Sequence, residues 1–347
     1  ADTHYSLGIV YAELGRNEDA LMQYRKTLKM DGNHTGAHEK IARLQKEITV
    51  RPQSQPTLQI EATPQELGGA AMHTQQSGIA HNLGHTEEDC IAMARYFLSL
   101  LPQKSGNPLP QQRDHPTAAK RSVDSLMAII PPQASLPYDM REVLTELVDS
   151  QSLFELQPAY GDTLITALAR IGGVPCMLIA NQPAVQAGAI TLEGATKACH
   201  FIQVADNFGL PLISLLDNPG VMPGPVAEKS GVLKAAGKMF LAQRRYRGQK
   251  IVVTLRKAFG FGSSVMGMNP WDGQVVSLAL PCTNLGGIPA IGGAEAAHAS
   301  KEETAQLQHL QSGAWVAADA MAFDKVITPG ELRNEMISAL YLQSSGF

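Results

Sequence analysis

The residues best suited to chemistry lie in Leu255–Met268, where an apolar segment runs into a glycine-rich turn. The apolar run Ile251–Leu255 predicts a buried strand, and Gly260-Phe261-Gly262 then opens into a short helix. A strand that ends in a glycine turn before a helix aims several backbone N–H groups at one point. Such a group of donors stabilises negative charge that develops on an oxygen, as an oxyanion hole does. A tight structural turn would have the same local sequence, so both interpretations stay open here.

Two glycine patterns imitate nucleotide-binding loops. The segment Gly231–Met239, GVLKAAGKM, contains G-x-x-x-x-G-K, but Met239 stands where a hydroxyl should hold Mg²⁺. No strand leads into it and its apolar spacing is helical, so we predict a helix packed through glycine and alanine. The turn Gly260-Phe261-Gly262 lacks the third glycine of a dinucleotide loop and is a poor nucleotide signature.

Other polar residues are weaker candidates for chemistry. Asp217 precedes Asn218-Pro219-Gly220 at the end of an apolar run, where its carboxylate could act as a base or hold the turn by an Asx-type bond. His73, His81 and His85 lack a Cys, Asp or Glu that would complete a ligand set, so no metal site is predicted. There is no Ser–His–Asp order and no G-x-S-x-G elbow.

Composition limits the classes of function. The chain has 347 residues, 44% of them apolar and 17% charged, which allows one large domain or two smaller ones. The net charge of −4 gives no electrostatic case for binding nucleic acid or an anionic membrane. No apolar run reaches the length of a membrane span, and no signal segment is recognisable at the start. Well-separated cysteines predict neither a zinc ribbon nor disulfides and favour a reducing compartment, the cytoplasm. These cysteines are Cys90, Cys176, Cys199 and Cys282.

Residues 1–50 are predicted to form a small all-α unit. A first helix should end near Leu14–Gly15, a second should cover about Glu18–Met30, and a third about Gly36–Ile48. The small and aromatic residues of LGIVYAELGRNEDALMQYRKTLKM are spaced as in one tetratricopeptide repeat, with Ala20 where two helices cross. One repeat cannot bury its own apolar face, so we expect it to dock on the next domain or to continue a longer array.

The remaining chain divides into three further parts. Residues 51–67 read as a proline-containing linker, residues 68–134 as a connecting region, and residues 135–347 as an α/β domain. Thr86 and Asp89 predict a capping box at the start of a helix. Continuous apolar runs that alternate with helical stretches indicate strands buried on both faces. The predicted strands are Cys176–Ala180, Ile213–Asp217, Ile251–Leu255 and Val275–Leu280. The predicted helices are Thr191–Asn207, Val226–Arg245, Gln311–Phe323 and Gly330–Leu342.

Several segments occur in the order found in one enzyme family. The most informative of them, Asn181–Gly224, combines a strand end, a glycine loop, a helix, a buried strand and a proline-glycine loop. The others are GGAAMHTQQSGIAHNLGHTEEDCIAMARYFLSLLP, YDMREVLTELVDSQSLFELQPAYGDTLITALARIGGVPCMLIANQP, LRKAFGFGSSVMGM and FDKVITPGELR. Over about residues 67–342 the chain resembles the acyl-CoA carboxyltransferases, the crotonase-like beta subunits of biotin-dependent carboxylases.

The resemblance implies a specific fold and chemistry. Each half of such a protein has a crotonase-like fold, a ββα superhelix. One oxyanion hole serves the thioester enolate and another serves the ureido oxygen of biotin, with no metal and no covalent enzyme intermediate. Carboxybiotin releases CO₂ locally, the ureido nitrogen removes the α-proton of the acyl group, and the enolate attacks the CO₂. Preorganised N–H donors suit both steps because the negative charge develops on oxygen.

Carried over by position, the resemblance also implies site residues. The backbone N–H groups of Phe261 and Gly262 would form the biotin-side oxyanion hole, although many relatives have two small residues there. Ser264 falls where many relatives carry a residue that tunes the choice of acyl chain. The remaining biotin-side surface corresponds to Asn181, Gln182, Gly188, Pro219, Gly220, Gly224 and Gly260.

One part of the family pattern is absent from this sequence. The N-terminal half, which binds coenzyme A, is represented only by its last segment within residues 68–134, and the tetratricopeptide-like unit stands in its place. The chain begins at Ala1, which suits a fragment or a processed product. We therefore expect a biotin-facing domain that depends on partners. These would be an acyl-CoA substrate, a biotin carboxylase with its biotin carrier protein, further copies of the chain, and a protein bound by the helical arm.

Three functional hypotheses remain on the sequence alone. The leading one is the carboxyltransferase component of a biotin-dependent acyl-CoA carboxylase. An acyl-CoA decarboxylase or a transcarboxylase would share the same half, and the sequence does not separate them. A non-catalytic scaffold derived from a carboxyltransferase would agree with the missing half, whereas the retained glycine turn favours an enzyme.

Overall fold

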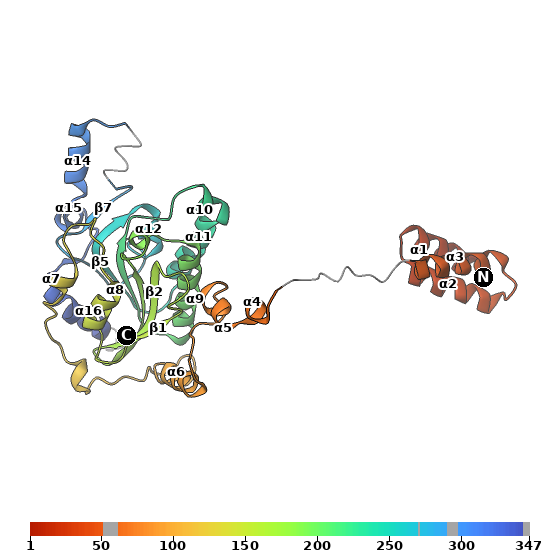
Figure 1. Ribbon diagram of the computed structural model, residues 1–347, viewed down its shortest axis with the longest axis horizontal. Helices are drawn as coiled ribbons and strands as arrows, with labels where there is room; N and C mark the ends of the chain where they lie inside the picture. Colours follow the sequence, from red (N-terminus) through yellow and green to blue (C-terminus); the bar gives the residue numbers. More distant parts are fainter. Residues whose placement is uncertain (51–61, 270, 290–297, 343–347) are drawn as a thin grey trace. The chain divides into compact units, whose positions relative to one another are not determined.

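The computed structural model describes residues 1–50, 62–269, 271–289 and 298–342 (Figure 1). By its internal contacts the chain divides into two compact units, Ala1–Ala62 and Thr63–Phe347. None of the helices within the described residues is both long enough and apolar enough to cross a membrane.

The first unit consists of three helices, α1 (Asp2–Glu13), α2 (Asn17–Met30) and α3 (Thr35–Val50), which confirms the three predicted helices. Its core contains the fully buried Ala20 and Tyr24. A Cβ added to Gly8 would lie 2.5 Å from the ring of Tyr24, so α1 can approach α2 closely only because glycine stands there. The tetratricopeptide assignment itself stays a prediction.

The second unit is built on one mixed sheet of eight strands. Strands β1 to β3 pair antiparallel, whereas β3, β4, β5, β6 and β8 follow one another in parallel, with β7 also parallel to β5. The parallel strands therefore bring their carboxyl ends to one edge. The strands are β1 (Phe154–Leu156), β2 (Leu164–Ile171), β3 (Val174–Asn181), β4 (Leu212–Asn218), β5 (Lys250–Phe259), β6 (Val276–Ala279), β7 (Asn284–Gly286) and β8 (Lys325–Val326).

Helices cover both faces of this sheet (Figure 1). On one side α7 (Leu126–Ile129), α8 (Met140–Leu147) and α16 (Leu332–Leu342) share a core with alternate residues of β2 and β3. On the other side α9 (Leu192–Phe208) and α11 (Val232–Arg244) pack on the intervening residues of the same strands. Burial on both faces explains why the strands read as continuous apolar runs.

The remaining helices are short or lie at the edges of the unit. The capping box of Thr86 with Asp89 is present at the start of α6, as predicted. The helix α4 occupies the last residues of the predicted linker, while residues 51–61 lie outside the described part. These elements are α4 (Pro64–Gly68), α5 (Ala70–Gln75), α6 (Glu87–Ser99), η1 (Pro116–Ala118), η2 (Gln186–Gly188), α10 (Pro225–Ser230), α12 (Gly260–Val265), α14 (Lys301–Gln311), α15 (Ala314–Asp319) and η3 (Pro329–Glu331).

Two predicted helices were wrong in extent. The predicted helix Val226–Arg245 is divided into α10 and α11 because Gly231 adopts a left-handed conformation, with φ of +88°, between them. The predicted helix Gln311–Phe323 begins where α14 already ends. A capping box of Ser300 with Glu303 starts that helix ten residues earlier, and only the short α15 follows it.

A buried ion pair ties the C-terminal helix α16 to the sheet. Arg333 Nη2 donates to Asp149 Oδ1 at 2.6 Å, and the Arg333 side chain is fully buried. Asp149 also accepts the backbone N–H groups of Gly172 and Gly173, in the turn between β2 and β3, at 3.0 and 2.7 Å. One carboxylate thus satisfies a helix and a hairpin at the same time.

We predict that Asp149→Ala lowers the free energy of unfolding by about 3–5 kcal/mol, because it leaves the Arg333 guanidinium buried without its counter-ion. The matched control is Glu335→Ala, a substitution in the same helix as Arg333. It breaks the half-exposed ion pair of Glu335 with Lys325, which lies in β8. That variant should lose at most about 1 kcal/mol. Urea unfolding followed by circular dichroism measures both, and equal losses would contradict the prediction.

Candidate functional site

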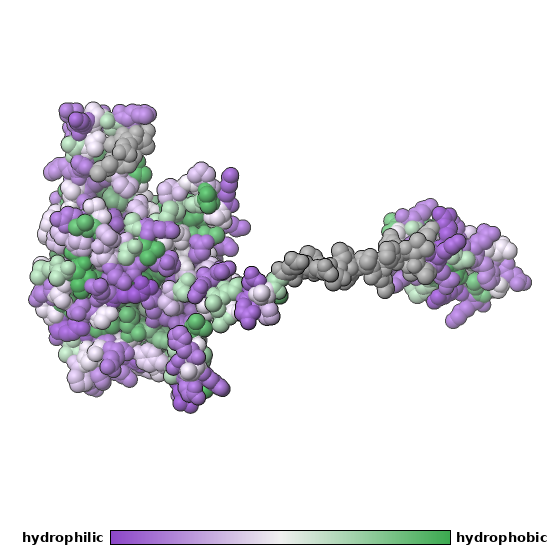
Figure 2. Space-filling view, viewed as in Figure 1, coloured by the Kyte–Doolittle hydropathy of each residue, from purple (hydrophilic) through white to green (hydrophobic). Residues whose placement is uncertain are grey.

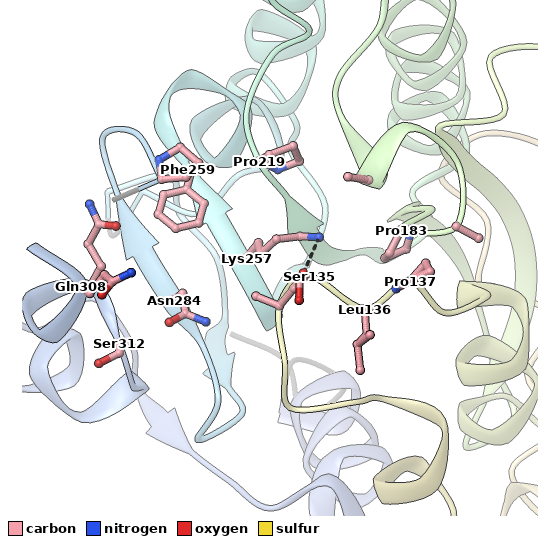
Figure 3. Close-up of a pocket in the computed structure, with 15 residues that line it drawn as sticks. Ser135, Leu136, Pro137, Pro183, Pro219, Lys257, Phe259, Asn284, Gln308 and Ser312 are labelled. Carbon is pink, nitrogen blue, oxygen red and sulfur yellow. Dashed lines mark hydrogen bonds between the residues drawn. The ribbon is translucent and has the colours of Figure 1, made fainter. Parts of the chain in front are cut away.

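A cavity of about 670 Å³ lies where β3, β4 and β5 end (Figure 3). Ligands of parallel α/β sheets bind in this position, outside the carboxyl ends of the strands, and the volume suits a small organic molecule. Proline, phenylalanine and alanine side chains supply much of the wall, together with three amides and one lysine. The lining residues are Ala134, Ser135, Leu136, Pro137, Pro183, Ala184, Ala187, Pro219, Lys257, Phe259, Asn284, Pro289, Gln308, Gln311 and Ser312.

The predicted glycine turn follows β5 directly. Strand β5 ends at Phe259, which lines the cavity, and α12 begins at Gly260. Gly260 has φ of +55°, and a Cβ there would lie 2.7 Å from the carbonyl oxygen of Gly287. The first N–H groups of a helix have no acceptor within that helix, and those of Phe261 and Gly262 belong to this set. The local geometry is therefore the one expected for backbone donors, and the oxyanion role stays a proposal.

This turn is in close contact with the loop that follows β4. A Cβ added to Gly262 would lie 2.4 Å from Asn218 Oδ1 and 2.7 Å from the Cα of Gly220. Pro219, between these two residues, lines the cavity. The structure thus brings the predicted residues Pro219, Gly220, Gly260 and Gly262 together beside the cavity. Only a residue without a side chain fits at position 262.

Asn181 connects the ends of three segments from inside the protein. Its Oδ1 accepts the backbone N–H of Asp217 and the Nδ2–H of Asn218, both at 3.1 Å. Its Nδ2 donates to the carbonyl oxygen of Gly188 at 3.0 Å. Because Asn181 is fully buried, its amide holds the loops in place rather than facing a ligand.

Gln182 has a comparable internal role at the start of α8. Its Oε1 accepts the backbone N–H of Met140 at 3.0 Å, and its Nε2 donates to Asp139 Oδ1 at 2.6 Å. Gly188 is buried as well, and a Cβ there would lie 2.5 Å from the carbonyl oxygen of Asp217. Asn181, Gln182 and Gly188 were predicted as part of the biotin-side surface, and their buried contacts support that surface from inside the protein.

The two interpretations left open for Asp217 are both replaced by an ion pair. The carboxylate is fully buried and accepts Arg256 Nε at 2.7 Å and Lys257 Nζ at 3.3 Å. The Asx-type bond that holds the turn belongs to its neighbour, since the Gly220 N–H donates to Asn218 Oδ1 at 3.0 Å. Asp217 therefore orders two cations beside the cavity.

Arg256 and Lys257 were missed from the sequence, where the only signal was a pair of charges inside an otherwise apolar strand. Arg256 Nη1 donates to the carbonyl oxygens of Pro131, Gln133 and Leu136 at 2.8 to 3.0 Å, which fixes the loop that forms one cavity wall. Lys257 lines the cavity itself. Burial lowers the pKa of Lys257, and the Asp217 carboxylate opposes this effect.

Among the described lining residues of the cavity, Pro219 is the one predicted site residue, and Phe261, Ser264 and Gly224 make their contacts elsewhere. Phe261 is 40% exposed, and its ring centroid lies 5.7 Å from that of Phe240 in α11, so it does not narrow the cavity. Ser264 Oγ donates to Asn269 Oδ1 at 3.1 Å. Gly224 is the N-cap residue of α10.

The other motifs keep their structural interpretations. Gly231–Met239 forms the start of α11, as predicted from its helical spacing, and no strand precedes it. Within the described part of the chain, no group of three potential metal-ligating side chains occurs. The ring of His81 packs against Phe201 at 5.0 Å, and His73 Nδ1 lies 3.0 Å from Ser77 Oγ.

Comparison with known proteins gives consistent matches. Residues 55–346 match the family described as "Carboxyl transferase domain". The methylmalonyl-CoA decarboxylase subunit alpha of Veillonella parvula is 34% identical over 292 residues, which cover 82% of this chain and 56% of that protein. A putative propionyl-CoA carboxylase beta chain of Bacillus subtilis is 31% identical over 292 residues, which cover 80% of this chain and 56% of that protein.

A solved structure, transcarboxylase 12S with methylmalonyl-coenzyme A and methylmalonic acid bound, superposes with a TM-score of 0.78. Its sequence is 30% identical, and the match covers 82% of this chain and 57% of that chain. This likeness confirms the predicted crotonase-like α/β fold. The chain spans about half the length of the curated relatives that it matches.

We predict that Gly262→Ala destabilises the protein by about 1–3 kcal/mol, because the added methyl group overlaps Asn218 and Gly220. The matched control is Gly237→Ala in α11, where a Cβ meets no atom within 4 Å. That substitution should instead stabilise the protein by about 0.5–1 kcal/mol through its effect on helix propensity. Chemical unfolding of the two variants tests the difference, and a neutral Gly262→Ala would refute the close contact.

Proposed function

This chain belongs to the carboxyl transferase domain family of biotin-dependent enzymes, and we propose that it is the biotin-facing part of a carboxyltransferase acting on an acyl-CoA. The observation that carries this proposal is the Phe261–Gly262 turn, which the Gly220 loop locks beside a cavity at the strand ends. When biotin is bound, it supplies a ring nitrogen that carries the carboxyl group.

The lining of the cavity fits such a cofactor. Pro183, Pro219 and Phe259 offer apolar walls to a bicyclic ring. The amides of Asn284 and Gln311 offer hydrogen bonds to a polar edge. Biotin on a partner carrier protein is therefore the proposed cofactor, and no metal is needed for the roles assigned to these side chains.

The backbone donors carry out the proposed catalytic role. The N–H groups of Phe261 and Gly262 would donate to a ureido oxygen as negative charge develops on it, with no reorganisation of the protein at that moment. Gly260 allows the chain to enter the turn, and Asn181 fixes the end of β4, whose following loop packs against Gly262. Ser264, on the same helix, is the proposed selectivity position.

The described cavity does not account for the binding of the acyl-CoA or of the protein partners. By the family resemblance the CoA-binding half is represented here only by its end, so we propose that a partner or a further copy completes the site. Exposed apolar side chains on α10 and α11 support a covered surface there, since Val226 is 83% and Leu233 51% exposed. Figure 2 shows hydrophobic surface over this part of the molecule. Transcarboxylase 12S is described as a hexamer assembly, which supports an oligomer.

The direction of carboxyl transfer stays a proposal. The Bacillus relative is named a carboxylase subunit, whereas the Veillonella relative is named a decarboxylase subunit and the solved relative is a transcarboxylase. Backbone donors to an oxyanion serve all three reactions.

We place the protein in the cytoplasm, as the widely spaced cysteines suggest.

The proposed donor role predicts opposite results for two substitutions of one residue. Phe261→Pro removes a backbone N–H in the first turn of α12, where proline is tolerated, and should lower turnover about 10²- to 10³-fold. Phe261→Ala removes the same phenyl ring but keeps the N–H and should stay within about tenfold of the native chain. The measurement is biocytin-dependent loss of malonyl-CoA or methylmalonyl-CoA, with and without biotin carboxylase and the carrier and CoA-binding subunits.

Two outcomes would count against the proposal. If the folded chain supports no biocytin-dependent turnover with any combination of subunits, the enzymatic function is wrong and a scaffold role is favoured. If Phe261→Pro and Phe261→Ala lose activity equally, the phenyl ring matters and the backbone donor does not.

A further inference from the structure

We propose that Lys257 makes the cavity a carboxylate site and binds the carboxyl group in transit through an ion pair. This inference rests on the proposed function, since it names the chemical group that the same cavity recognises. The ligand class is a small organic acid with an apolar body and one carboxylate, which binds Lys257.

The first observation is the charge of the buried cluster. One carboxylate, Asp217, faces two cations, Arg256 and Lys257. The other titratable neighbours are Tyr138 and Cys282, and burial raises the pKa of both, so they stay neutral at pH 7. The cluster therefore carries a formal charge of +1. A buried charge without a counter-ion is costly, and an anion in the cavity would remove that cost.

The second observation is how loosely Lys257 is held. Its Nζ lies 3.3 Å from Asp217 Oδ1, which is long for an ammonium. It also donates to the carbonyl oxygen of Ala134 at a long 3.4 Å, the bond drawn as a dashed line in Figure 3. An ammonium group has three donors, so one is left after these two contacts with described residues. Asp217 is held more tightly by Arg256, at 2.7 Å, and does not need Lys257 to be paired.

The third observation is that the cluster is not saturated. Among the described residues, Arg256 Nη2 is buried without a hydrogen-bond partner. The Arg256 guanidinium lies 4.6 Å from the centre of the Tyr138 ring, so the two groups belong to the same pocket of buried charge. An unsatisfied buried donor is rare in native proteins, and this one indicates that protein acceptors do not fully match the positive charge of the cluster.

The lining of the cavity defines the rest of the ligand. Lys257 is the one charged side chain among its described lining residues, and the opposite wall carries the amides of Asn284, Gln308 and Gln311. A cavity with apolar walls, one cation and a few amides selects an acid with an uncharged body over a phosphate or a polyanion. Two carboxylates of the proposed reaction fit, one on a biotin ring nitrogen and one on a carboxylated acyl group.

The experiment measures carboxylate binding by titration calorimetry on the full chain, with monomethyl methylmalonate as the probe, because this monoester has one carboxylate and an uncharged body. Native protein should bind monomethyl methylmalonate and not the neutral dimethyl ester. Lys257→Met, which keeps the length of the side chain but removes its charge, should weaken binding about 10- to 100-fold. Lys234→Met removes a charge from an exposed position of α11 and should bind as the native chain does.

The pH dependence provides a readout that a purely structural role would not change. Burial lowers the pKa of Lys257, so the ammonium is lost at a lower pH than in a free lysine. Binding of monomethyl methylmalonate should fall as the pH rises through that lowered pKa, and Lys257→Arg, which stays charged, should keep its binding at the higher pH. Thermal unfolding of each variant shows that it is folded.

Further arms identify the source of the carboxylate and separate this inference from the proposed function. Tighter binding of N-carboxymethyl biocytin than of biocytin indicates that the carboxylate is the one on biotin. Tighter binding of methylmalonyl-CoA than of propionyl-CoA indicates that it is the one on the acyl group. Either result supports the carboxylate site. Binding of monomethyl methylmalonate without biocytin binding overturns the proposed function only. Equal binding by native protein and folded Lys257→Met, or no binding by the native protein, overturns the carboxylate site.

Discussion

Buried polar contacts between the ends of β3, β4 and β5 are the constraint on which the site depends. Asn181 at the end of β3 holds the backbone of β4, and Asp217 in β4 holds Arg256 in β5. Arg256 in turn holds the carbonyl groups of the cavity wall. Because these groups are charged or polar and buried, each destabilises the folded protein unless its partner is in place. The strand ends, the wall and the glycine turn therefore form one cooperative unit.

Local sequence was enough to predict the parts of the site that depend on local structure. The apolar run Ile251–Leu255 and the glycines that follow it indicated a strand, a turn and a short helix, and all three are present. The reason for glycine at position 262 was not accessible, because it is a contact with Gly220 in a different loop. Asp217 was ambiguous for the same reason, since its partner Arg256 lies 39 residues further along the chain.

The missed strand β2 shows another limit of pattern reasoning. Thr166 and Arg170 interrupt its apolar run, yet both are buried. The structure satisfies them through distant backbone groups, since Thr166 Oγ1 donates to Leu156 and Arg170 Nη2 to Ser99. A polar residue in a strand indicates an exposed face only when no such acceptor is available, and the sequence does not reveal the acceptor. The sequence therefore provided no reason to include Arg170 in a buried strand.

The arrangement of charge also explains why a carboxyl-transfer site would share its lysine with Asp217. A fully free ammonium would bind a carboxylate strongly, and that binding would stabilise the ground state as much as the transition state. Asp217 and burial weaken the attraction of the Lys257 ammonium for a bound carboxylate. The backbone donors at Phe261 and Gly262 carry no formal charge and act on a different oxygen, where negative charge develops. On the proposed assignment the cation holds the carboxyl group only moderately, and the N–H donors gain strength as charge leaves it. Separation of these two tasks between β5 and α12 requires a direct connection of the strand to the helix, which the positive φ of Gly260 allows.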